Sequence, residues 1–322
     1  MTGRGWFSAA AALLVLVLVA GCGVGRGSAK VLAPDDEIKV GVIPVADFAP
    51  VYIAAEEGYF EDEGLKVKTQ VMQNAAAIAP SVINGQLQFG TAAVPPFLGA
   101  VQKGLPLKAV ANGTSIAADP EQDPSALVAG PGSGVERPKD LEGKTVAVNA
   151  LSSVVHVTAA AAIKADGGDP AKVTFVAMPF PDMVPALARG AIDAASLVEP
   201  FYARSVGQGT RVLAHPYSSA LSPNGTFTVI FTAGPFIETN PEIVRKFARA
   251  VDKASVEAAK HPEKVGAVLA KYGKLPPEVF SKIKVPLYSD NLDTAAMDHT
   301  AGLMQQLGFL PDAVDVEKAV WK

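Results

Sequence analysis

The sequence predicts an α/β fold made of two similar lobes, and three observations support this prediction. Short runs rich in β-branched residues alternate with helical patterns from Ile38 onward, which is typical of a mostly parallel sheet covered by helices. The alternation starts again near Lys144. Glycines and prolines also recur at a fixed offset of 105 residues: Gly85, Pro95 and Gly104 match Gly190, Pro200 and Gly209.

The first lobe contains four expected strands and three expected helices. The strands are Ile38–Ile43, Leu65–Val71, Phe89–Thr91 and Leu107–Ala111. The helices are Val51–Glu57, Ala75–Asn84 and Pro95–Lys103. A glycine directly follows each helix, and glycine readily adopts the left-handed conformation that ends a helix.

The second lobe repeats this order, and a helical region follows it. Its expected strands are Lys144–Val148, Val173–Ala177 and Ile192–Ser196, and its expected helices are Ser152–Asp166, Met183–Arg189 and Pro200–Val206. Ser152 is suited to cap its helix. A strand over Thr226–Thr232 and a long amphipathic helix from Asn240 to Lys260 come next, then helical segments around Pro262–Tyr272, Pro277–Lys282 and Leu292–Leu307.

The expected division follows from these elements. Residues 37–114 and 235–322 form lobe I, and residues 115–234 form lobe II. The hinge candidates are the loop-like stretches Asn112–Pro124 and His215–Asn224.

The N-terminus has the pattern of an export signal. Arg4 precedes an apolar run from Ser8 to Val19, which is short for a membrane span. The run ends in Val19-Ala20-Gly21-Cys22, which resembles a bacterial lipobox, so residues 1–21 are expected to be a signal peptide and Cys22 to carry a lipid. Cys22 is the only cysteine, and an exported protein has no internal partner for it. Residues 22–36 then form a flexible tether; the alternative is an ordinary signal with a cysteine near its end by chance.

Composition excludes several classes of function. Without its first 21 residues the chain has 301, and loss of Arg4 changes the net charge from −4 to −5. No basic patch suggests a nucleic-acid partner. The sequence lacks a G-x-S-x-G motif, a Walker loop and a dinucleotide-binding glycine motif, and its four histidines have no metal-ligand spacing. No catalytic residue, cofactor or metal is therefore expected.

One segment carries a specific resemblance. The run Ala54-Ala55-Glu56-Glu57-Gly58-Tyr59-Phe60-Glu61-Asp62-Glu63-Gly64-Leu65-Lys66-Val67 resembles the first lobe of periplasmic substrate-binding proteins for nitrate, sulfonates and thiamine pyrimidine precursors. Gly104–Lys108, Leu141–Val148, Val198-Glu199-Pro200 and Asn240-Pro241 resemble later motifs of this family. The resemblance implies a type II periplasmic-binding-protein fold, with a ligand cleft between lobes joined by a hinge. It also implies the solute-binding component of an ABC importer.

Candidate ligand-binding residues come from loops after strands, because parallel sheets bind ligands at the carboxyl ends of their strands. In the first lobe they are Asp47, Phe48, Tyr52, Asn74, Ala75, Val94 and Pro95, and in the second Ser152, Ser153, His156, Phe180, Glu199 and Tyr202. The four aromatic rings among them can sandwich a planar group or belong to the core. Asn74 and Ser152 can place a helix N-terminus near an anion or act as plain helix caps.

The charges of these loops indicate the ligand. They contain Asp47 and Glu199 but no Arg or Lys. A carboxylate repels an anion, so we expect a neutral or cationic nitrogen heterocycle such as a thiamine pyrimidine precursor. The alternatives are a nitrate, sulfonate or taurine ligand, and a carboxylate that caps a helix or faces solvent. The family resemblance also makes a pyrimidine-synthase enzyme an alternative function, but the cysteine-rich iron motif of these enzymes is absent here.

The working partners follow from the same resemblance. We expect a monomer, lipid-anchored on the extracytoplasmic side of the membrane, that delivers a small molecule to an ABC permease and its ATPase. The alternative is a receptor that passes its ligand to a signalling partner.

Overall fold

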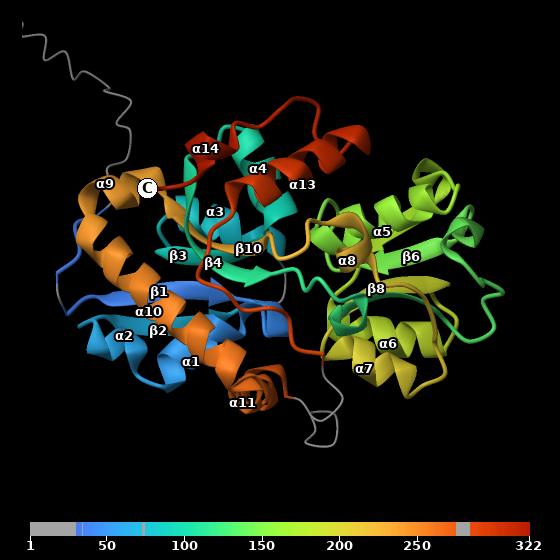
Figure 1. Ribbon diagram of the computed structural model, residues 1–322, viewed down its shortest axis with the longest axis horizontal. Helices are drawn as coiled ribbons and strands as arrows, with labels where there is room; N and C mark the ends of the chain where they lie inside the picture. Colours follow the sequence, from blue (N-terminus) through green and yellow to red (C-terminus); the bar gives the residue numbers. More distant parts are fainter. Residues whose placement is uncertain (1–29, 34, 73–74, 275–283) are drawn as a thin grey trace, which may run out of the picture.

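Two five-stranded sheets form the centres of two lobes that lie side by side in a computed structural model (Figure 1). The structure describes residues 30–33, 35–72, 75–274 and 284–322. The predictions for residues 1–21, Cys22, Asn74 and the helix around 277–282 lie outside the described residues. Among those that are described, no helix is both long and apolar enough to cross a membrane.

The sheet of lobe I has the order β2-β1-β3-β10-β4. Its strands are β1 (Glu37–Val42), β2 (Lys66–Val71), β3 (Phe89–Ala93), β4 (Leu107–Ser115) and β10 (Thr226–Ala233). Strand β1 pairs in parallel with β2 and β3, and β10 runs antiparallel to β3 and β4. One group of helices in this lobe is α1 (Ala49–Glu56), α2 (Tyr59–Asp62), α10 (Pro241–Lys260) and α11 (Pro262–Gly273). The other group, on the opposite side of the sheet in Figure 1, is α3 (Ile78–Ile83), α4 (Val94–Gln102), α13 (Thr294–Gln306) and α14 (Val316–Ala319); α9 (Gly234–Thr239) follows β10.

The sheet of lobe II has the order β7-β6-β8-β5-β9, which repeats the arrangement of lobe I strand for strand. Its strands are β5 (Ser125–Ala129), β6 (Thr145–Val148), β7 (Thr174–Ala177), β8 (Ala194–Val198) and β9 (Arg211–Ala214). Its helices are α5 (Val154–Ala165), α6 (Phe180–Ala188), α7 (Phe201–Val206) and α8 (Pro216–Ala220). Short 3-10 turns lie between these elements in both lobes, at Ala46–Phe48, Ala75–Ala77, Pro120–Gln122, Pro138–Leu141 and Pro170–Lys172. The predicted repeat is therefore a repeat of sheet topology, with β3 and β8 separated by the expected 105 residues.

Aromatic packing fixes the long helix α10 against the sheet of lobe I. The ring of Phe247 lies 3.8 Å from that of Phe89 and 4.8 Å from that of Phe60. Phe60 is fully buried two residues after Gly58, which adopts a φ of 74° at the end of α1. The Gly-Tyr-Phe run therefore has a role in packing.

The structure differs from the predicted division at β10. The boundary at 234 assigns this strand to lobe II, whereas β10 lies between β3 and β4 of lobe I. Strand order along the chain does not reveal which sheet a strand joins, because the pairing partners of β10 are more than 100 residues away. The chain thus returns to lobe I before Thr226.

One other expectation is corrected. The helix expected from Ser152 begins at Val154, and Ser152 has a φ of 59°. Asn240 precedes α10 but makes no side-chain cap; its amide instead accepts from the N–H of Leu32 and donates to the carbonyl of Lys30.

Two segments connect the lobes, after β4 and before β10, and a buried aspartate ties them together. Oδ1 of Asp123 accepts from the N–H of Ser125 at 2.8 Å, and Oδ2 accepts from the N–H of Ser218 at 2.7 Å. A third segment, residues 284–293, lies beside these two crossings, because the N–H of Ser115 donates to the carbonyl of Leu287 at 2.7 Å, and we call it the third crossing segment. The crossings coincide with the two predicted hinge stretches.

Candidate functional site

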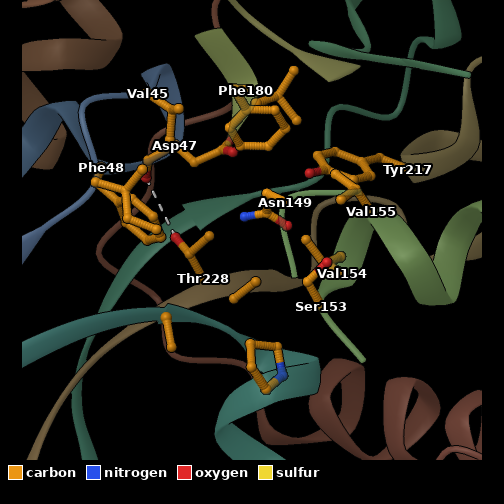
Figure 2. Close-up of a pocket in the computed structure, with 15 residues that line it drawn as sticks. Val45, Asp47, Phe48, Asn149, Ser153, Val154, Val155, Phe180, Tyr217 and Thr228 are labelled. Carbon is orange, nitrogen blue, oxygen red and sulfur yellow. Dashed lines mark hydrogen bonds between the residues drawn. The ribbon is translucent and has the colours of Figure 1, made fainter. Parts of the chain in front are cut away.

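A small cavity of about 40 Å³ lies between the two lobes (Figure 2). Its walls come from segments that follow β1, β3, β6, β7 and β8, and from β10 and α8. This is the position that parallel sheets favour for ligands. The lining residues are Ile43, Val45, Asp47, Phe48, Ala92, Ala93, Pro96, Asn149, Ser153, Val154, Val155, Phe180, Val198, Tyr217 and Thr228.

Among the described residues of this lining, Asp47 supplies the one carboxylate. It lies in the 3-10 turn after β1 and is only 5% exposed. Its Oδ1 has no hydrogen-bond partner among the described residues. Burial, and to a lesser degree the charge of Asp123, raises the pKa of Asp47 to about 7. In Figure 2 its side chain extends toward Phe180, and its backbone carbonyl accepts from Thr228 Oγ1 at 3.4 Å.

Lobe II contributes two polar groups opposite. Asn149 follows β6, and Ser153 precedes the first turn of α5. Within the described part of the chain, Asn149 Oδ1 and Ser153 Oγ are buried without hydrogen-bond partners. A buried polar atom without a hydrogen-bond partner costs free energy. Three such atoms around a single cavity therefore indicate a place where a ligand can supply the missing hydrogen bonds.

Apolar and aromatic side chains form the rest of the wall. Phe48 and Phe180 come from opposite lobes, and Phe180 is held by a stacked Phe201 with ring centroids 5.6 Å apart. Tyr217 also lines the cavity, and burial raises its pKa well above the ordinary value. Among the described residues that line the cavity there is no Lys, Arg or His.

Four of the predicted site residues thus lie on this cavity: Asp47, Phe48, Ser153 and Phe180. Sequence reasoning missed Asn149, Tyr217 and Thr228. The position of Asn149 directly after a predicted strand was a usable signal. Tyr217 and Thr228 carried none, because the first lies in a short helix at the crossing and the second in a strand assigned to the other lobe.

Glu199 lies beside the cavity and not on its wall. It is 1% exposed, and burial raises its pKa to about 7. Its two oxygens accept backbone N–H groups, from Ala203 in the first turn of α7 and from Lys284 in the third crossing segment, each at 3.2 Å. The carboxylate therefore caps a helix, which is one of the alternatives left open by the sequence, and joins the lobes.

Two other predicted rings pack against protein. Tyr52 stacks on Tyr272 at 4.2 Å and donates to the carbonyl of Val42. Tyr202 packs edge-on against His215, with its ring below Lys284. Neither ring is among the described residues that line the cavity.

His156 lies in a second region between α5 and the end of α13. Its ring packs against Phe175 and Phe309, and burial lowers its pKa to about 4. A neutral ring at physiological pH can accept a hydrogen bond, and its Nδ1 accepts from the N–H of Ser152 at 2.9 Å. The remaining predicted site residues that the structure describes also lie away from the cavity wall. Ser152 and Pro95 line a neighbouring, larger cavity. Val94 is buried at the start of α4, and Ala75 begins a 3-10 turn.

Solved structures identify the class of fold. The chain resembles the alkanesulfonate-binding protein of Xanthomonas axonopodis with a TM-score of 0.75 at 18% identity, over 90% of this chain and 99% of that one. It resembles the nitrate-binding protein of Synechocystis with a TM-score of 0.72 at 16% identity, over 88% and 84% of the two chains. With the cavity between its lobes, the protein has the type II periplasmic-binding-protein fold.

The family is defined by sequence. The chain belongs to the family described as NMT1/THI5 like, whose model matches residues 45–265, more than half of its length. It is 28% identical over 239 residues to the riboflavin-binding protein RibY of Chloroflexus aurantiacus, and 24% identical over 209 residues to the taurine-binding periplasmic protein of Escherichia coli. These matches cover 70% and 65% of this chain but only 63% and 62% of the relatives. Both relatives are named as binding proteins and not as enzymes.

Proposed function

We propose that this protein is the extracytoplasmic solute-binding component of an ABC importer, with its ligand in the cavity between the lobes. The observation that carries the proposal is this cavity, in which buried polar atoms of both lobes have unmet hydrogen bonds. A ligand that bridges Asp47 and Asn149 stabilises the closed arrangement of the lobes. Closure around a ligand is the hinge motion common to two-lobed binding proteins.

The ligand we propose is a neutral or cationic nitrogen heterocycle with N–H donors. Asp47 offers an acceptor that no described residue uses, and the lining has no cation to hold an anion. At an effective dielectric of about 20, an anion in contact with the ionised carboxylate is repelled by several kcal/mol. Phe48 and Phe180 offer flat faces to a ring. The name of the riboflavin-binding relative supports this class, because riboflavin is a neutral nitrogen heterocycle.

The helix starts around the cavity support the same choice. Pro95 and Pro96 occupy the second and third positions of α4, and Pro181 the second position of α6. Proline has no N–H, so these helix ends offer an anion fewer donors than an ordinary helix start. We infer that these two helix starts are poorly suited to a sulfonate or nitrate.

A taurine-like zwitterion is the second candidate. The first turn of α5 has no proline, and it lies at the cavity with Ser153 and Val154. An ammonium at Asp47 and a sulfonate at this helix start would satisfy both groups, and the cavity is small. The name of the taurine-binding relative supports this candidate.

The proposed location is the outer face of the membrane, with a lipid on Cys22 and residues 22–36 as the tether. The periplasmic relative and the lipobox-like sequence support it. Labelling of cells with a radioactive fatty acid, with Cys22→Ser as the control, tests the anchor. The proposed partners are a permease and its ATPase.

Calorimetric titration of the purified protein tests the ligand class. The probes are hydroxymethyl-aminopyrimidine, taurine and an alkanesulfonate without an amine. We expect the aminopyrimidine to bind in the micromolar range or better and the alkanesulfonate to be at least a hundredfold weaker. Tight binding of the alkanesulfonate that survives Asp47→Asn and Glu199→Gln overturns the proposal, and tight binding of taurine alone selects the second candidate.

A further inference from the structure

A second and larger cavity adjoins the first. Its volume is about 400 Å³, against about 40 Å³ for the cavity of Figure 2, which we call the inner cavity. The two share Ala92 and Pro96 as lining residues. We call the larger space the outer chamber. It is bounded by α3 and α4, by the end of α13 and the region after it and, from lobe II, by Leu151 and Ser152.

The walls of the outer chamber are mainly apolar. Pro95, Phe97 and Gly99 come from α4, and Met304 and Leu310 come from the C-terminal region. Leu151 completes the wall from lobe II, although it is 57% exposed. An apolar space that spans both lobes, next to a cavity with a few unmet polar atoms, matches the usual composition of small-molecule sites.

The backbone beside Leu151 is unusual. Ser152 adopts a φ of 59°, a left-handed conformation that residues other than glycine rarely take. The bond from its N–H to Nδ1 of His156 holds it there. Such outliers concentrate at ligand sites, and this one presents an exposed leucine at the chamber.

We propose that the outer chamber receives the apolar body of the same ligand whose N–H-bearing head lies in the inner cavity. The inference rests on the heterocycle proposed above, and it specifies an elongated molecule with a polar end and an apolar end. The adjacency of the two spaces supports this assignment, because Ala92 and Pro96 line both. The inner cavity alone has too little volume for a fused ring system, whereas the two together have enough.

Gly99 allows a test that spares the fold. It lines the outer chamber only, and a Cβ added there has no side chain or distant backbone within 4 Å. Gly99→Leu should therefore fill the chamber and also favour the helix, since glycine is a poor helix former. The matched control is Gly302→Leu in α13, where an added Cβ is equally free and which lines neither cavity.

The probes are hydroxymethyl-aminopyrimidine, which is a head alone, and lumichrome, a flat tricycle with N–H groups at one end and a dimethylbenzene at the other. We expect lumichrome to bind the unmodified protein more tightly than the aminopyrimidine. Gly99→Leu should weaken lumichrome at least tenfold and the aminopyrimidine less than twofold, and Gly302→Leu should change neither.

Three results overturn the inference. Lumichrome affinity that is unchanged in Gly99→Leu excludes the chamber as its site. An equal loss for both probes shows a general disturbance in place of a separate subsite. Aminopyrimidine binding without any lumichrome binding removes the outer chamber from the ligand site and leaves the proposed function intact, whereas failure of both probes removes both.

Discussion

Asp47 and Glu199 are two buried carboxylates, one in each lobe, with opposite surroundings. Both follow a strand, both are at most 5% exposed, and burial raises the pKa of each to about 7. Both oxygens of Glu199 accept backbone N–H groups, while Oδ1 of Asp47 has no partner among the described residues. Burial and a raised pKa therefore do not separate the two carboxylates. The unmet hydrogen bond at the cavity is the reason why we propose Asp47, and not Glu199, as the carboxylate that binds the ligand.

Ligand affinity should separate the two carboxylates most strongly. Asp47→Ala should weaken the aminopyrimidine about 30-fold or more, because a hydrogen bond to a charged group contributes about 1.5–3 kcal/mol. Glu199→Gln should change the affinity less than about threefold, because Glu199 is absent from the cavity wall. A threefold change in affinity corresponds to about 0.6 kcal/mol of binding free energy. Calorimetry at pH 8 measures both.

Equal losses in the two variants would contradict this assignment. They would mean that Glu199 acts on the ligand through the position of α7 or of the third crossing segment. Asp47→Asn is the companion variant for Asp47, because it preserves shape while it removes the charge.

Stability against pH provides the second separation. The pKa of Asp47 rises from 3.8 to about 7 on folding, so the folded protein retains a proton that the unfolded chain loses. The contribution of Asp47 to stability is thus full below pH 4 and is lost as the pH rises to 7. Asp47→Asn should increase the free energy of unfolding by about 2–4 kcal/mol at pH 8, and this gain should vanish near pH 4.

Urea unfolding of both proteins at pH 4, 6 and 8 measures this gain. Glu199→Gln should gain less free energy of unfolding at pH 8. Both oxygens of Glu199 accept backbone N–H groups, and the NH₂ group of glutamine would replace one of these acceptors by a donor. A gain that does not depend on pH would show that the carboxyl of Asp47 is not the titrating group.

The fold was largely predictable because its signals are local and repeated. Glycine after each helix and the offset of 105 residues identified two equivalent sheets. Two strands were not expected. β5 (Ser125–Ala129) is buried throughout, so it shows no alternation of polar and apolar residues, and β9 (Arg211–Ala214) is four residues long.

The site was predictable only in part because it depends on contacts between distant segments. Asp47 and Phe180 follow strands, and that position was enough to select them. The same rule also selected Glu199 and Tyr202. In the structure Glu199 caps a helix and Tyr202 packs against His215. No pattern along the chain shows that Lys284 directs its N–H at Glu199 from 85 residues away.

Local opening at the crossing provides the smallest expected effect and concerns Glu199 directly. Its carboxylate accepts from the N–H of Lys284, so Glu199→Ala should leave that amide without its acceptor. Loss of about 1 kcal/mol of net hydrogen-bond free energy corresponds to roughly fivefold faster hydrogen exchange at Lys284. Exchange followed by NMR at single amides measures this, with Asp47→Ala as the control because the carboxylate that accepts from the N–H of Lys284 is that of Glu199. Faster exchange at Lys284 in both variants would show that the crossing responds to the cavity as a whole, and the two carboxylates would then share one structural role.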